Sequence, residues 1–81
     1  MSTLPTIDET EKWDTEKIIE FLGEQNLNLT ESDFEFFRKQ RIEGQEFLDL
    51  TQEELQGGLG LGPAKRIVKL IKKIKGKDQG K

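Results

Sequence analysis

One long amphipathic segment near the C-terminal end limits what this chain can fold into. Its apolar side chains follow the i, i+3, i+4, i+7 spacing: Ile67, Leu70, Ile71 and Ile74. This spacing places them on one face of an α-helix and leaves the lysines of the segment toward solvent. Pro63 suits the first position of this helix because its missing N–H is not needed there, and Gly76 is predicted to end it. Shorter elements must supply the rest of the core.

Capping signals predict two of these shorter elements in the first half of the chain. Asp14 can cap a helix over about residues 15–25. Thr30 followed by Asp33 resembles a second capped start, for a helix that ends near Gln40.

Two further short helices are predicted before the glycine-rich stretch. Residues 45–49 have room for about one helical turn. Thr51 and Glu54 form a capping box, which opens a helix over about residues 52–56 that the next two glycines end. In this interpretation Gly44 lets the chain turn ahead of the one-turn helix.

The predicted fold is all-α: a compact five-helix bundle with a long C-terminal helix. No segment shows the alternation typical of a strand. A chain of 81 residues supports one small core, because it buries only roughly 60% of its unfolded surface. Residues 1–12 are polar and lack apolar periodicity, so they are predicted to be a flexible lead-in to a domain over residues 13–75. Residues 76–81 are predicted to be a flexible tail.

The composition argues against several kinds of site. The chain has no Cys and no His, so a disulfide framework, a thiolate nucleophile and the commonest zinc ligands are missing. We expect no cofactor, no metal site and no enzymatic activity. No apolar run approaches the roughly 20 residues that span a bilayer, and the first residues lack a signal-peptide pattern. A cytoplasmic or nuclear setting is the expectation.

Charge is divided unevenly along the chain. Residues 1–55 carry fifteen acidic and five basic side chains, a net of −10. Residues 56–81 carry one acidic and eight basic side chains, a net of +7. A domain with two such ends could dock its basic end on the acidic side of a neighbour.

The glycines at residues 57–62 suggest a phosphate-binding loop, but the pattern does not fit one. A nucleotide-phosphate loop needs a Lys and a hydroxyl residue after the last glycine, and Pro63 and Ala64 stand there. The dinucleotide fingerprint fails on glycine spacing and on the lack of a parallel sheet. Gly60-Leu61-Gly62 also resembles the turn of a helix-hairpin-helix DNA-binding motif, which stays open as an alternative.

Taken together, the elements resemble a sterile alpha motif domain over about residues 13–75. That family has a Trp at its first helix, a core Phe before an Ile-Asp/Glu-Gly step, and a Leu-Thr-x-x-x-Leu segment. The matching residues here are Trp13, Phe37, Ile42-Glu43-Gly44, Leu50-Thr51-Gln52-Glu53-Glu54-Leu55 and Leu59-Gly60-Leu61-Gly62. The resemblance implies a non-catalytic protein-interaction module.

Many domains of this family associate by placing the start of the last helix on the middle of a neighbour. The implied end-helix surface consists of Gly62, Pro63, Ala64, Lys65, Arg66 and Lys69. The implied mid-loop surface consists of Glu43, Glu46, Asp49, Glu53 and Glu54. The expected partner is a second copy or another sterile alpha motif domain, in a closed oligomer or an open helical polymer.

Nucleic-acid binding is the alternative function. Some members of the family bind RNA hairpins through basic residues at the start of the last helix. Here Gly60, Gly62, Lys65, Arg66 and Lys69 would contact phosphates. The acidic residues nearby and Ala64 in place of a basic residue argue against it.

Overall fold

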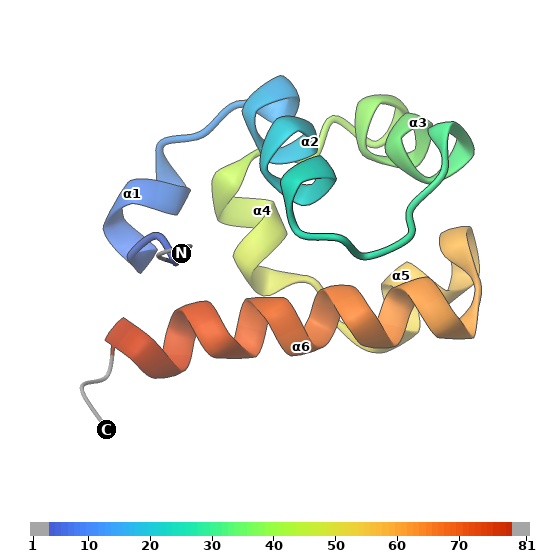
Figure 1. Cartoon of the computed structure of the whole chain (residues 1–81). Helices are drawn as coiled ribbons and strands as arrows, with labels where there is room; N and C mark the ends of the chain where they lie inside the picture. Colours follow the sequence, from blue (N-terminus) through green and yellow to red (C-terminus); the bar gives the residue numbers. More distant parts are fainter. Residues whose placement is uncertain (1–3, 79–81) are drawn as a thin grey trace.

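The computed structural model describes residues 4–78, of which residues 77 and 78 are described by their backbone alone. The described residues form six helices and no strand. The helices are α1 (Ile7–Glu11), α2 (Thr15–Glu24), α3 (Glu31–Lys39), α4 (Gly44–Asp49), α5 (Gln52–Leu59) and α6 (Leu61–Asp78). The long helix α6 crosses the molecule, and the shorter helices pack on it (Figure 1). The all-α prediction is confirmed, but the count of five helices is one too low.

The predicted apolar face of α6 forms the centre of the core. Ile67, Leu70, Ile71 and Ile74 are all buried. They meet buried side chains from α2, α3, α4 and α5, among which the largest fully buried ones are Ile18, Leu22, Phe37, Phe47 and Leu55. Each short helix therefore contributes apolar side chains to a core that α6 completes.

The extra helix is α1, so the expectation of a flexible segment before Trp13 is wrong for the residues described there. Thr6 and Glu9 form a capping box in which Glu9 N–H donates to Thr6 Oγ1 over 3.1 Å. The hydroxyl of Thr10 is fully buried and donates to the Thr6 carbonyl over 2.8 Å. Helix α1 packs on α4 and α6, so it is part of the fold. Residues 1–3 lie outside the described chain.

Gly44 is needed for close approach rather than for a turn. A Cβ at this position would overlap the backbone of Thr10 and Glu11, so glycine lets the start of α4 lie directly against α1. The Gly44 N–H also donates to the Trp13 carbonyl over 2.9 Å. The turn itself is made at Arg41, whose φ of 53° places it in the left-handed region at the end of α3.

The glycines around α5 and α6 do not end helices where the sequence predicted. Helix α5 continues through Gly57 and Gly58 to Leu59, and α6 continues through Gly76 to Asp78. The break falls at Gly60, whose φ of 94° is strained for any residue with a side chain. Residues 79–81 of the predicted tail lie outside the described chain.

Helix α6 begins two residues before Pro63, so Pro63 still lies in its first turn. The N–H groups of the first turn have no carbonyl partner within the helix, so a proline there costs no helical hydrogen bond.

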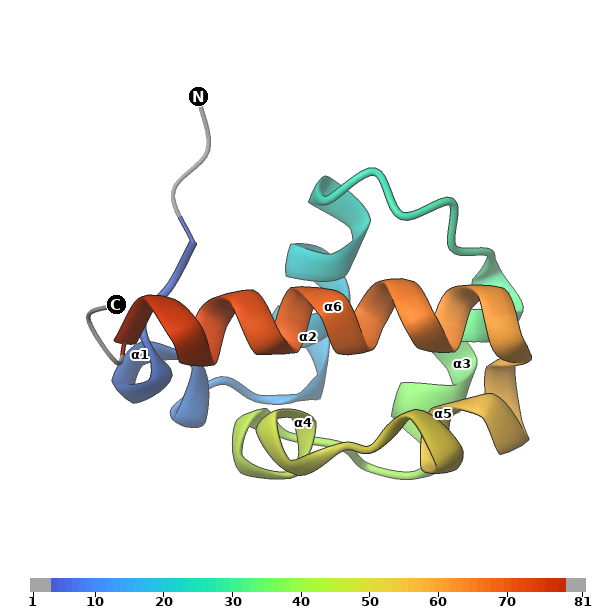
Figure 2. The same ribbon diagram turned by 90° about the horizontal axis from the view of Figure 1, so that it is seen from below.

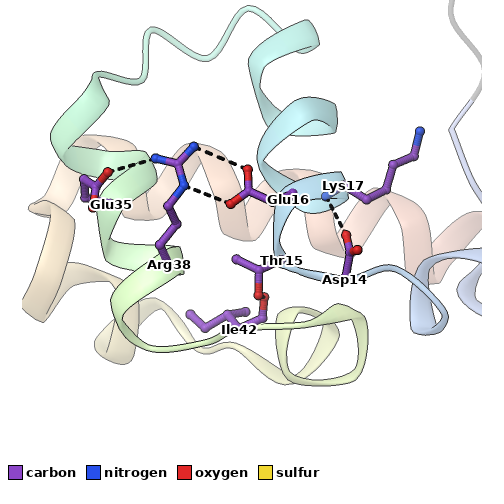
Figure 3. Close-up of polar contacts among 7 residues, drawn as sticks. All are labelled: Asp14, Thr15, Glu16, Lys17, Glu35, Arg38 and Ile42. Atoms are coloured by element: carbon purple, nitrogen blue, oxygen red, sulfur yellow. Dashed lines mark hydrogen bonds and ion pairs between the residues drawn. The ribbon is translucent and has the colours of Figure 1, made fainter.

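Arg38 ties α2 to α3 on the surface. Its Nε donates to Glu16 over 2.9 Å and its Nη1 to Glu35 over 2.8 Å (Figure 3). The hydrogen bonds that Arg38 donates to Glu16 and then to Glu35 hold the pKa of Arg38 above its ordinary value. Nearby, Thr15 Oγ1 donates to the Ile42 carbonyl over 2.9 Å, which joins α2 to the α3–α4 connection. The contact from Thr15 helps to hold the α3–α4 connection, in which Ile42 borders the site described next.

Candidate interaction surfaces

A groove of about 650 Å³ lies open to solvent between α3, α4 and α5. It is lined by Phe36, Gln40, Ile42, Glu46, Asp49, Leu50, Glu54, Gly57 and Gly58. Three of the five predicted mid-loop residues therefore lie around one hollow: Glu46, Asp49 and Glu54. Glu43 and Glu53 are exposed but do not line it.

Apolar side chains form part of this groove. Phe36 and Leu50 are only half-buried, although both contact the core. The Phe36 ring packs edge-on against Phe37, with 5.5 Å between ring centres. A Cβ on Gly58 would overlap the Phe36 ring, so the ring packs against the backbone of α5 only because this residue is a glycine. The groove thus combines partly exposed apolar surface with carboxylates.

Two of the groove carboxylates are held in position by helix capping. Glu46 Oε1 accepts from the Glu43 N–H over 3.0 Å, and Glu54 Oε1 accepts from the Thr51 N–H over 3.1 Å. Each carboxylate also lies in the first turn of its helix, where the helix dipole favours negative charge. Their negative charges are therefore ordered before any partner arrives.

The basic residues of the predicted end-helix surface lie on α6. Lys65, Arg66 and Lys69 are exposed. Arg66 is also anchored, because its Nε donates to the Leu27 carbonyl in the α2–α3 connection over 2.8 Å. A shallow hollow of about 200 Å³ lies beside it, lined by Gln25, Leu27, Arg66, Lys69, Leu70 and Lys73.

The three small residues of the end-helix surface have different surroundings. Gly62 is exposed and Pro63 is half-buried at the first turn of α6. Ala64 is fully buried, so its side chain belongs to the core and not to the surface. This placement corrects the prediction, and it follows from the helical period, because Ala64 lies three residues before Ile67 on the inner face.

Sequence reasoning missed Leu61, the first residue of α6. It is 50% exposed and is the one large apolar side chain found exposed among residues 4–76. Leu61 precedes Lys65 by four residues, so the two lie on the same side of the helix. The sequence does hold a signal for it: Leu61 lies between two glycines and outside the apolar period of the helix that follows, which indicates an exposed leucine.

A comparison with protein families settles the family. A family model described as a SAM-like domain matches residues 1–73. The chain belongs to the SAM-like domain family. Searches of curated proteins and of solved structures gave no match. The match confirms the resemblance to the sterile alpha motif, and it includes the segment that forms α1. SAM-like domains are in general protein-interaction modules and are typically not catalytic.

The two charged surfaces of this SAM-like domain face different directions. Helices α4 and α5 lie on one side of α6, and the α2–α3 connection that holds Arg66 lies on the other (Figure 2). The ion pairs found among residues 4–76 join Lys17 to Glu20 and Arg38 to Glu16 and Glu35. None of them uses a charge of either predicted surface, so these charges are open to a partner.

Other kinds of site find no support in the described part of the SAM-like domain. Between residues 4 and 76, no group of three or more acidic side chains is placed to hold a metal ion. None of the described helices is both long enough and apolar enough to cross a membrane.

Proposed function

We propose that this SAM-like domain associates head-to-tail, with the end-helix surface of one copy on the mid-loop surface of the next, and that it has no catalytic role. One observation carries the proposal: the charges on each surface are of one sign, exposed, and without an ionic partner among residues 4–76. Opposite potentials of this kind steer two proteins together and fix their orientation.

The two surfaces differ, so the contact is heterologous: one copy of a docked pair keeps a free mid-loop surface, and the other keeps a free end-helix surface. Such a contact either closes into a ring or grows as an open helical polymer. Helices α4 and α5 and the α2–α3 connection lie on opposite sides of α6, so docking at one surface leaves the other uncovered for a further copy (Figure 2).

Order in the charged groups supports the same proposal. Glu46 and Glu54 are held by capping, and Arg66 is held by the Leu27 carbonyl. Side chains that are already fixed lose less conformational entropy on binding than free ones do. Lys65 and Lys69 have no such anchor among residues 4–76 and would adjust to the carboxylates of the neighbour.

Sedimentation velocity over a range of protein concentrations tests the proposal. We expect species larger than a monomer at low salt, and a monomer for the variant Lys65→Glu, Lys69→Glu. This pair leaves the contact between Arg66 and Leu27 intact. The matched control is Lys72→Glu, Lys75→Glu, which makes the same change of charge farther along α6, at residues that line neither hollow, and should still assemble. Assembly of both variants alike would reject the end-helix surface.

Mixing two blocked copies tests the head-to-tail direction. The helix-blocked copy carries Lys65→Glu, Lys69→Glu, and the groove-blocked copy carries Asp49→Lys, Glu53→Lys. Neither should assemble alone, but each keeps one working surface, so a mixture should give a 1:1 dimer. A mixture that stays monomeric contradicts head-to-tail docking. A wild type that is monomeric at every concentration rejects self-association, and RNA binding at low salt is then the measurement to make.

A further inference from the structure

We infer that Leu61 of one copy inserts into the groove between α3, α4 and α5 of the next copy. This inference rests on the proposed head-to-tail association and names the contact at its centre. Leu61 is the exposed apolar side chain at the tip of the end-helix surface, and the groove is the hollow of the mid-loop surface.

Leu61 has the properties of an anchor. Half of its surface is exposed, whereas every leucine and isoleucine of the core is at least nine-tenths buried. It is absent from the apolar side chains that pack on the core, so the fold itself makes little use of it. An exposed apolar side chain contributes most to binding when a partner's pocket removes it fully from water.

The groove has the complementary properties. Phe36, Ile42 and Leu50 present apolar atoms to it, and Glu46, Asp49 and Glu54 add negative charge around them. On α6, Lys65 follows Leu61 by one turn, so its positive charge lies beside the leucine. In the groove, the carboxylates lie beside the apolar side chains in the same way. Apolar surface then meets apolar surface, and Lys65 meets the carboxylates.

Gly57 keeps the groove open. It lines the groove on α5, and a Cβ there would meet no atom within 4 Å. A Cβ at this position therefore fits the monomer, and we expect a longer side chain to take up space that Leu61 of a neighbour would need. Gly57→Leu is therefore a groove-filling variant that leaves all charges unchanged.

The 1:1 dimer of helix-blocked and groove-blocked copies gives a directional test, since it contains one interface only. Its dissociation constant is measured by isothermal titration calorimetry, and thermal melts check that each copy is folded. Leu61→Ala in the groove-blocked copy, whose α6 docks, should weaken the dimer by roughly tenfold to a hundredfold. The same substitution in the helix-blocked copy should leave the dissociation constant unchanged.

Gly57→Leu gives the reciprocal result. It should weaken the dimer to a similar degree in the helix-blocked copy, whose groove is occupied, and have no effect in the groove-blocked copy. A dimer that forms but is insensitive to both substitutions, or equally sensitive in either copy, overturns the insertion of Leu61 and leaves head-to-tail association standing. A mixture that forms no dimer overturns both.

Discussion

Gly57 and Gly58 are neighbours in α5, yet they differ in what surrounds them. Gly57 faces open space, whereas the ring of Phe36 fills the position that a Cβ of Gly58 would take. The sequence showed a glycine pair and predicted a helix end, because two residues of low helix propensity usually mark one. Packing against Phe36 keeps the helix going, and no local pattern encodes that contact.

Alanine at the two positions should therefore have opposite effects. Gly57→Ala should stabilise the monomer by about 0.5–1 kcal/mol, since it raises helix propensity without a steric conflict. Gly58→Ala should destabilise it by about 1–3 kcal/mol, since the Phe36 ring must move. Urea unfolding followed by Trp13 fluorescence measures both. Equal shifts for the two variants would contradict the placement of Phe36.

Among the elements, α3 and α5 were predicted from their capping boxes, whereas α1, which also has one, was not predicted. Thr30 with Asp33 and Thr51 with Glu54 were interpreted correctly as helix starts. Thr6 with Glu9 has the same spacing, but only five helical residues follow, and they show no apolar period. Such a helix is stabilised by the α4 and α6 surfaces on which it packs, which a local pattern cannot show.

The contact between α1 and α4 can be broken at Gly44. Gly44→Ala should lower the free energy of unfolding by about 1–3 kcal/mol, because its Cβ would overlap the Thr10 backbone. Thermal unfolding by circular dichroism measures the loss. In a chain that starts at Trp13 the same substitution should cost much less, since the overlapping residues are gone. An equal loss in both chains would mean that α1 does not lie on Gly44.

At the scale of the whole molecule, the division of charge was visible in the sequence, but the groove was not. Counting acidic and basic residues along the chain gave the two ends. The groove needs Phe36, Ile42, Glu46 and Glu54 from successive segments of the chain to meet, which only the tertiary structure can provide. Among the predicted end-helix residues, Ala64 is buried because the helical period turns it inward, and the interface role of the others stays a prediction.

Salt should separate the two contributions to assembly. Charge attraction between exposed groups is screened over about 10 Å at 0.1 M salt, whereas apolar contact is not weakened by screening. We expect the sedimenting species of the wild type to become smaller as sodium chloride rises from low to high concentration. Leu61→Ala should assemble less than the wild type at each salt concentration. Assembly that is indifferent to salt would contradict a charged interface.

The close packing of α1 beside the far end of α6 has a consequence for how this domain can be joined to others. Both ends of the described chain lie at one pole of the molecule, and the junction of α5 and α6, which carries Leu61, lies at the other (Figures 1 and 2). Polypeptide fused to either end would leave from the pole opposite Leu61. A fluorescent label or a cargo domain attached there would keep clear of the start of α6.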